Sequence, residues 1–85
     1  MNVTVRFFIF DLPPNFAQAE FELNDGATIS DVFDRCLEVF EQRQVSMKES
    51  ELRTATIVVG AKWLNPGDAV SDGDIINIIR PMDGG

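Results

Sequence analysis

The sequence predicts an α+β domain in which one main helix covers one face of a mixed sheet of four to five strands. Three observations lead to this fold class. Segments of alternating apolar and polar residues open the chain, a stripe of apolar residues at helical spacing follows, and short apolar runs bounded by turns fill the second half. With 85 residues, 45% of them hydrophobic, the chain is long enough for one folding unit and too short for two.

Two strands are expected in the first quarter of the chain. Residues 3–10 are rich in β-branched and aromatic side chains, and the alternation of a strand separates them into two faces. The face toward the helix is expected to carry Val3, Val5, Phe7 and Ile9, and the opposite face Thr4, Arg6, Phe8 and Phe10. A pair of prolines ends this strand, and residues 19–23 alternate again with Phe21 and Leu23 facing in. The second strand is expected to form a hairpin with the first.

A helix is expected to begin at Thr28. Thr28 followed by Asp31 resembles a capping box, in which the hydroxyl accepts a hydrogen bond from a free backbone amide and the acid favours the positive helix end. Apolar residues then recur at steps of three and four and form one stripe: Ile29, Val32, Phe33, Cys36, Leu37 and Phe40. Because burial of this stripe stabilises the domain, the helix is expected to lie on the sheet.

The second half of the chain is expected to supply three more strands. Residues 41–54 are polar and are expected to form a long connection anchored by Leu52, in which Ser46 with Glu49 could cap a short helical turn. Apolar segments bounded by turns predict strands over residues 55–59, 63–64 and 75–79. The resulting order, β-β-α-β-β-β, is that of the β-grasp fold.

Charge and composition exclude several classes of function. The net charge of −7 repels phosphate backbones, and the seven Lys and Arg residues are scattered, so no nucleic-acid partner is expected. The longest apolar run, residues 7–10, is far too short to span a bilayer, so no membrane partner is expected. A single cysteine and the lack of a basic-then-apolar leader predict a cytoplasmic protein.

The residue types that are missing argue against an enzyme. The chain has no His and no Tyr, which removes the usual general base near neutral pH and any Ser-His or Cys-His nucleophile. Cys36 lies in the apolar stripe and is expected to be an inert core residue. Asp68, Asp72 and Asp74 lack the spacing of a calcium loop and are explained by turns, so no metal site is expected. Trp63 is expected to be a partly buried lid on the core.

The end of the chain is its most informative feature. Gly84 and Gly85 lose more backbone entropy on ordering than other residues, so stability gives no reason for them to follow a strand. The last four residues reach at most about 13–14 Å, and a stretch without Cβ atoms enters a channel too narrow for side chains. We therefore expect a β-grasp domain over residues 1–81 and a flexible C-terminal diglycine tail over residues 82–85.

Fold and tail together resemble the ubiquitin-like sulfur carriers, the MoaD and ThiS family. The resemblance is carried by residues 3–10, by GATISDV at 26–32, by VGAKW at 59–63, and by VSDGDIINIIRPMDGG at 70–85. The last segment is the most specific, since the family ends in an Asp-Gly-Asp turn, an apolar strand, Pro and Gly-Gly. Because Pro81 precedes the small terminal residues, the chain resembles MoaD more closely than ThiS.

The resemblance implies a carrier rather than a catalyst. An ATP-using MoeB- or ThiF-like enzyme would adenylate the carboxylate of Gly85, which follows Gly84, and a sulfur donor would convert it to a thiocarboxylate. The acceptor would be a molybdopterin precursor held by a MoaE-like large subunit, or, for a ThiS-like carrier, a thiazole under construction. No cofactor is expected on this chain, because ATP is used by the adenylating enzyme.

Two other functions fit the same residues. One is a ubiquitin-like modifier joined through Gly85 to a lysine of another protein, and the other is an interaction module whose tail has no role. In each case a partner is expected to contact the open sheet face or the tail, unless the 41–54 connection or the proline loop covers that face. The expected partner-binding residues are Phe8, Phe10, Ile79, Arg80, Pro81, Met82 and Asp83.

Overall fold

The computed structural model describes residues 1–81, apart from the side chain of Pro14. Its elements in chain order are β1 (Asn2–Phe8), the 3-10 helix η1 (Pro14–Phe16), β2 (Gln18–Glu22), α1 (Ile29–Gln42), α2 (Glu49–Arg53), β3 (Thr56–Val59), β4 (Lys62–Leu64) and β5 (Ile75–Ile79). Every expected strand and the expected helix are present. A second helix, α2, lies within the segment that was expected to be a connection.

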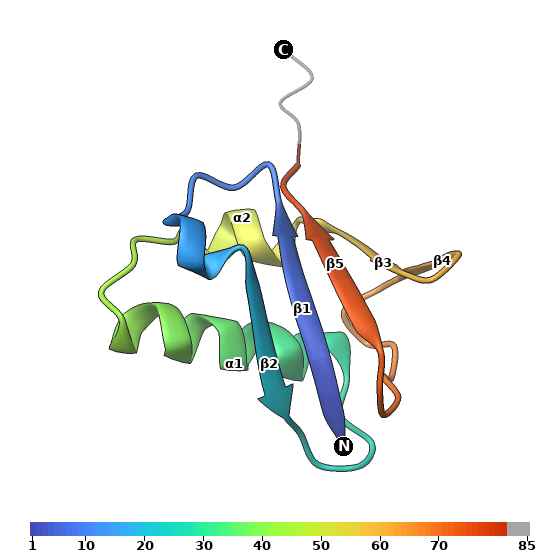
Figure 1. The fold of residues 1–85 in the computed structure, drawn as a ribbon. Coiled ribbons are helices and arrows are strands. Elements are labelled where there is room, and N and C mark those ends of the chain that lie inside the picture. The colour runs from blue at the N-terminus through green and yellow to red at the C-terminus, as the bar shows by residue number, and fades with distance from the viewer. Residues whose placement is uncertain (82–85) are drawn as a thin grey trace.

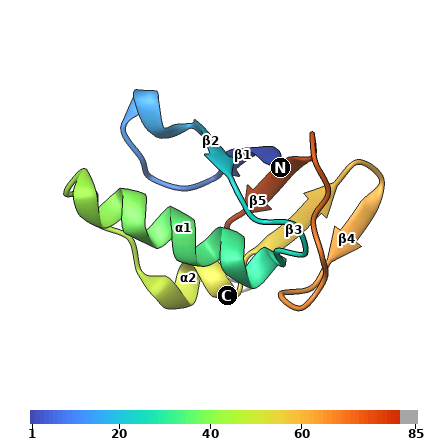
Figure 2. The same ribbon diagram turned by 90° about the horizontal axis from the view of Figure 1, so that it is seen from below.

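All five strands form one mixed sheet in the order β2-β1-β5-β3-β4 (Figure 1). β1 is antiparallel to β2 and parallel to β5, while β3 is antiparallel to both β4 and β5. Figure 2 shows α1 and α2 on the same side of the sheet. This is the β-grasp fold that the order of elements predicts. Because β5 is the central strand, the described chain ends in the middle of the sheet rather than at its edge.

The apolar stripe of α1 forms the centre of the core. Its residues Ile29, Val32, Phe33, Cys36 and Phe40 are buried, and Leu37 is half-buried. They pack against buried residues from the inner face of the sheet, which include Val3, Val5, Phe7, Phe21, Ile57, Ile76 and Ile78. Full burial of each larger side chain contributes roughly 1.5–3 kcal/mol, so this contact between helix and sheet dominates the stability of the domain.

The capping box predicted at the start of α1 is confirmed. The Thr28 hydroxyl accepts a hydrogen bond from the Asp31 backbone N–H at 3.4 Å, and the Asp31 carboxylate accepts one from the Thr28 N–H at 2.8 Å. Both contacts satisfy amides that have no partner within the helix. The helix therefore begins where the local sequence places it, with its stripe facing the sheet.

The predicted alternation of the first strand fails at Ile9. β1 ends at Phe8, and Ile9 has a φ of 67°, a left-handed conformation that β-branched residues rarely adopt. The backbone turns over at this residue, so Ile9 is 58% exposed, whereas Phe10 is half-buried with its ring 6.0 Å from that of Phe7. Both expected positions are wrong: Ile9 is not in the core, and Phe10 does not lie on the open face.

Leu52 and Arg53 hold α2 against α1 and the core. Leu52 is completely buried, as expected for an anchor. Arg53 lies 2.7 Å from both the Glu49 and the Asp34 carboxylates, and its guanidinium lies over the ring of Phe33 at 5.9 Å. The hydrogen bonds that Arg53 donates to the Asp34 and Glu49 carboxylates raise the pKa of its guanidinium above the ordinary value. Arg53 thereby links α2 to the exposed side of α1.

The turn before β5 binds the chain to the start of β1. The Asp72 carboxylate accepts a hydrogen bond from the Asn2 N–H at 2.7 Å, and the Gly73 N–H donates to the Asn2 carbonyl at 2.7 Å. Asp74 accepts from the Ser71 N–H at 2.8 Å, which closes the turn. Gly73 has a φ of 84°, where glycine avoids the clash that a Cβ atom causes. These contacts set the parallel register between β1 and β5.

The expected position of Trp63 is also wrong. Its side chain is 80% exposed on β4, which is an edge strand, so it does not cover the core. Trp63 lies opposite Val58 in the register, and since the neighbouring Ile57 faces the core, Trp63 lies on the face away from it. In residues 1–81, no helix combines the length and the apolar character needed to cross a membrane.

Candidate functional site

The candidate site begins at the C-terminal end of β5, just before the end of the described chain. β5 is paired with β1 in parallel, with Ile79 opposite Phe8. Beyond this pair, the Arg80 N–H donates to the Phe8 carbonyl at 3.0 Å and extends the pairing by one residue. Pro81 is half-buried. The root of the tail is therefore held against the centre of the sheet, at the end of β5 seen in Figure 1.

The side chain of Arg80 turns toward α2 rather than toward the open face. Its Nη2 lies 3.2 Å from Glu51 Oε1, and both side chains are partly exposed. Arg80 and Glu51 also line a hollow of about 350 Å³ together with Phe10, Met47 and Lys48. Arg80 thus marks the helix side of the tail root, and Phe8 marks the opposite side.

The register of the sheet defines the open face, which is the side away from α1. The row nearest the tail root consists of Phe8, Ile79 and Thr56. The next row runs across the whole sheet through Gln18, Arg6, Asn77, Val58 and Trp63. A third row contains Glu20, Thr4 and Ile75. The exposed apolar side chains of these rows are Phe8 at 43%, Ile75 at 44% and Trp63 at 80%.

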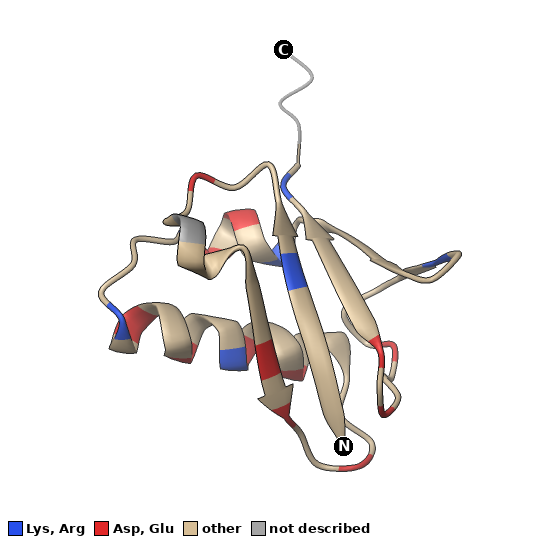
Figure 3. Cartoon of the chain, in the orientation of Figure 1, with Lys and Arg blue, Asp and Glu red and all other residues tan. Residues whose placement is uncertain are grey.

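Charge is distributed unevenly over this molecule. None of β1, β3, β4 and β5 contains an acidic residue, although the chain has 14 of them (Figure 3). On the open-face rows, Arg6 is the charged residue of β1, and its Nε donates to Gln18 Oε1 at 3.3 Å. The acids of the sheet, Glu20 and Glu22, lie on β2. The acidic residues behind the net charge of −7 therefore lie on the helices, the loops and the edge strand β2.

The structure brings some of the sequence-predicted site residues together and separates others. Phe8 and Ile79 are neighbours on the open face, next to the tail root. Phe10 packs toward the core, and Arg80 pairs with Glu51 on the helix side. The remaining predicted residues, Met82, Asp83, Gly84 and Gly85, lie outside the described residues.

Four residues near the site escaped the sequence analysis. Val58, Ile75 and Trp63 belong to the open face, and Glu51 is the partner of Arg80. The signal for Val58 and Trp63 is cross-strand register, which places residues of distant segments in one row. The signal for Ile75 is local, because alternation along β5 puts it on the same face as Ile79. The Glu51 contact joins residues 29 positions apart and has no local signal.

Cys36 has no chemical role at this site. Its side chain is 1% exposed and lies in the helix–sheet core, as expected. Burial raises the pKa of its thiol from 9.0 to about 12, an effect that the nearby Arg35 charge only partly opposes. Because the thiolate is the reactive form, this cysteine is inert at neutral pH.

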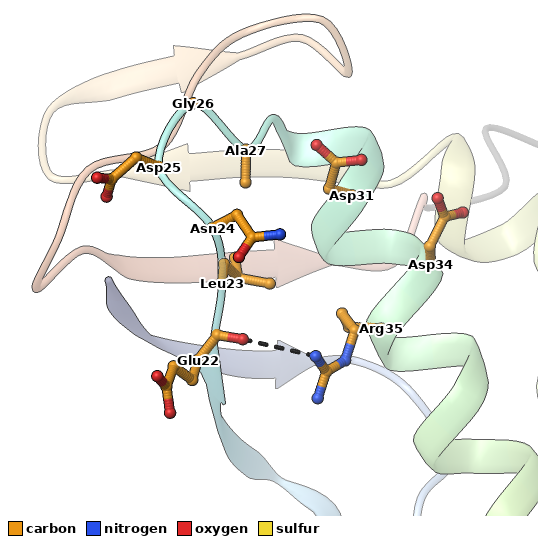
Figure 4. Close-up of a pocket in the computed structure, with 9 residues that line it drawn as sticks. All are labelled: Glu22, Leu23, Asn24, Asp25, Gly26, Ala27, Asp31, Asp34 and Arg35. Carbon is orange, nitrogen blue, oxygen red and sulfur yellow. Dashed lines mark hydrogen bonds between the residues drawn. The ribbon is translucent and has the colours of Figure 1, made fainter.

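A second hollow lies at the other end of the sheet, and it holds no catalytic grouping. It measures about 410 Å³ and lies between the end of β2 and the first turns of α1 (Figure 4). Arg35 Nη1 donates to the Glu22 carbonyl at 3.5 Å across it, beside the carboxylates of Asp31 and Asp34. Within residues 1–81, no three His, Cys, Asp or Glu side chains are grouped so that they could hold a metal ion.

Several solved structures share the fold of this chain. The molybdopterin converting factor subunit 1 described from Pyrococcus furiosus superposes with a TM-score of 0.68 at 18% identity, over 96% of this chain and 99% of that one. SAMP1 of Haloferax volcanii, a small archaeal modifier protein, superposes with a TM-score of 0.68 at 18% identity over the full length of both chains.

A third neighbour was solved together with its partner. In a protein–protein complex of subunits 1 and 2 of the molybdopterin-converting factor from Helicobacter pylori, one chain matches with a TM-score of 0.55 at 22% identity, over 100% of both chains. No known protein family and no curated protein matches the sequence itself. At these identities the neighbours establish the β-grasp fold.

Proposed function

We propose that this protein is a ubiquitin-like sulfur carrier whose reactive group is the C-terminal carboxylate of Gly85. One observation carries the proposal. The central strand of a β-grasp sheet ends beside the exposed Phe8 and the half-buried Ile79, and the sequence that follows is short and finishes in Gly84-Gly85. A carrier requires a compact domain, a face that docks on other proteins and a terminus without side chains. It does not require a catalytic cavity of its own.

The chemistry takes place on enzymes that act on the tail. A carboxylate is a poor electrophile, so an adenylating enzyme of the MoeB or ThiF type first joins it to the AMP part of ATP and releases pyrophosphate. A sulfur donor then displaces AMP from the acyl-adenylate and leaves the thiocarboxylate of Gly85. Because the last two residues are glycines without side chains, the tail fits a narrow active site. The last four residues reach at most about 13–14 Å from the domain.

The acceptor proposed for the sulfur is a molybdopterin precursor bound by a MoaE-like large subunit. The Pro81-to-Gly85 ending supports this choice, and so does the shape shared with subunit 1 of the molybdopterin converting factor. In the complex from Helicobacter pylori, subunit 1 is bound to subunit 2. The Phe8–Ile79 pair is the surface proposed to contact the large subunit, since exposed apolar groups around a tail root serve as docking contacts.

A second candidate function is protein modification. The similarity to the small archaeal modifier protein of Haloferax volcanii favours it. Both functions share the adenylation of Gly85 and differ in the next step, in which a lysine amine of a target protein would displace the activated group. The two functions are therefore separated by their products and not by the fold.

Intact-mass measurement tests the proposal. The full chain is incubated with ATP, sulfide and an adenylating enzyme encoded in the same genome. The expected product is heavier by the difference between one sulfur and one oxygen atom, and a chain lacking Gly84 and Gly85 gives no product. Cys36→Ala should give the same gain, which distinguishes a thiocarboxylate from a persulfide, because a persulfide adds a whole sulfur atom. No gain in the full chain, or conjugates to lysine in its place, contradicts sulfur transfer.

A further inference from the structure

Ile9 is unfavourable for the isolated domain in two ways. Its backbone has a φ of 67°, where a β-branched side chain is crowded by the backbone, and its side chain is 58% exposed. The other left-handed residues among residues 1–81 are three glycines, Gly26, Gly60 and Gly73, and the polar Gln44. A glycine or an asparagine would make the same turn with less strain. The need for a turn explains the conformation, but it does not explain the isoleucine.

Contacts on both sides hold Ile9 in this conformation. The Phe8 carbonyl accepts a hydrogen bond from the Arg80 N–H at 3.0 Å, which fixes the preceding residue to the end of β5. The following residue, Phe10, packs against the core with its ring edge-on to that of Phe7. Strained residues persist where the surrounding structure determines their backbone, and they concentrate at functional sites. The strain is therefore built into the fold, and its location indicates a use.

That location is directly beside the root of the tail. In the parallel pairing of β1 with β5, Phe8 lies opposite Ile79. One residue further along, Ile9 lies level with Arg80, and Figure 1 shows the loop that follows β1 beginning next to the end of β5. Phe8 and Ile9 are consecutive and both exposed, at 43% and 58%. The strained residue thus belongs to the surface from which the tail leaves the domain.

The length of the tail determines which surface covers Ile9. Four residues, 82–85, follow Pro81, and fully extended they span at most about 13–14 Å. An enzyme that acts on the Gly85 carboxylate must bring its own surface within this distance of Pro81. A channel that admits the tail surrounds it, so the mouth of the channel lies against the residues next to the root. Contact there removes the apolar side chain of Ile9 from water.

We infer that Ile9 is a docking residue for the enzyme that adenylates Gly85, and that it inserts into an apolar pocket at the mouth of the channel that takes up the tail. The inference rests on the function proposed above, since it needs an enzyme that acts on the tail. Adenylation is the step that sulfur transfer and protein modification share, so both candidate functions require this enzyme. Burial of Ile9 in the complex offsets the unfavourable position that it occupies in the free domain.

Steady-state kinetics of adenylation test this inference. The full chain is titrated against the adenylating enzyme encoded in the same genome, and exchange of pyrophosphate into ATP gives kcat and KM for the chain. Ile9→Asn keeps the left-handed backbone and removes the apolar side chain. It is expected to raise KM about tenfold and to leave kcat unchanged, because a contact away from the reacting carboxylate contributes equally to ground-state and transition-state binding. Calorimetry without ATP is expected to show the same loss of affinity.

Two controls separate docking from stability. Ile9→Val keeps the branched Cβ and most of the apolar surface, and is expected to raise KM at most about threefold. Ile75→Asn removes a 44% exposed isoleucine at the other end of β5 and is expected to leave KM unchanged. Urea unfolding shows whether each variant is folded under the assay conditions. Because Ile9→Asn relieves strain, it is expected to be more stable than the unmodified chain, so unfolding does not account for a higher KM.

The outcomes distinguish this inference from the proposed function. Exchange with the unmodified chain and an equal KM for Ile9→Asn overturns the docking role of Ile9 and leaves the activation of Gly85 intact. A lower kcat at an unchanged KM, or an equal rise of KM in Ile75→Asn, also overturns that role. A loss confined to sulfur transfer to the acceptor assigns Ile9 to a different partner and overturns the choice of enzyme. No exchange with the unmodified chain contradicts both proposals.

Discussion

Arg80 and Glu51 form an ion pair of 3.2 Å between the root of the tail and α2. The contact joins the end of the described chain to α2, a short helix within the 41–54 connection. Together with the bond from the Arg80 N–H to the Phe8 carbonyl, it fixes the tail root on two sides.

The first prediction concerns the strength of this pair. Its side chains are 40% and 33% exposed, so solvent screens the charges and the coupling is expected to be about 0.2–1 kcal/mol. Urea unfolding of Glu51→Gln, Arg80→Gln and the double variant measures it as a thermodynamic cycle. The coupling should shrink in high salt. Strictly additive effects of the two substitutions contradict the contact.

The second prediction compares two apolar residues of the open face. Phe8 and Ile75 are 43% and 44% exposed, but Phe8 lies beside the tail root and Ile75 at the other end of β5. Phe8→Ser is expected to lower kcat/KM for thiocarboxylate formation or sulfur transfer about tenfold or more. Ile75→Ser is the matched control and is expected to have little effect. Equal losses in the two variants would show that the docking surface is not centred on the tail root.

The third prediction concerns pH and the buried thiol. Burial raises the pKa of Cys36 from 9.0 to about 12. As the pH rises above 9.0, the thiol ionises in the unfolded chain while the folded chain keeps its proton, so the free energy of unfolding falls between 9.0 and about 12. Cys36→Ala lacks this contribution.

Urea unfolding of both proteins on either side of pH 9.0 checks the sign. The stability advantage of the unmodified chain over Cys36→Ala should decrease as the pH rises. A constant difference means that the thiol titrates normally in the folded state. Rapid alkylation of the folded protein at neutral pH contradicts burial as well.

The fourth prediction concerns backbone strain at Ile9. A β-branched residue at a φ of 67° costs about 1–2 kcal/mol, and asparagine tolerates this conformation better. Because Ile9 is 58% exposed, Ile9→Asn loses little burial and should raise the free energy of unfolding by about 1 kcal/mol. Ile9→Val keeps the branched Cβ and should leave it unchanged. If urea unfolding gives the same free energy of unfolding for Ile9→Asn and Ile9→Val, the backbone at residue 9 is not strained.

Local signals explain how much of the fold could be predicted. The capping box of Thr28 and Asp31 and the stripe of α1 depend on residues three or four positions apart, so the sequence predicts them directly. The face assigned to Phe10 failed because a single left-handed residue, Ile9, reversed the alternation. No local rule predicts that conformation at a β-branched residue.

The site was harder to predict than the fold because it depends on cross-strand register. Trp63 and Arg6 share a row only because β3 and β5 lie between β4 and β1 in a fixed alignment. Glu51 of α2 contacts Arg80, which follows β5. The two residues are 29 positions apart in the sequence, so the contact depends on tertiary packing. The terminal glycines are read directly from the sequence, whereas the face formed beside the end of β5 required the structure.

Radiolabelled pyrophosphate exchange tests the central proposal most directly. An adenylating enzyme incorporates labelled pyrophosphate into ATP only when a substrate supplies the carboxylate that it activates. With the full chain, exchange is expected to require both the enzyme and Gly85, and to disappear when Gly84 and Gly85 are deleted. Equal exchange with the truncated chain, or none with the full chain and its own adenylating enzyme, contradicts activation of the tail.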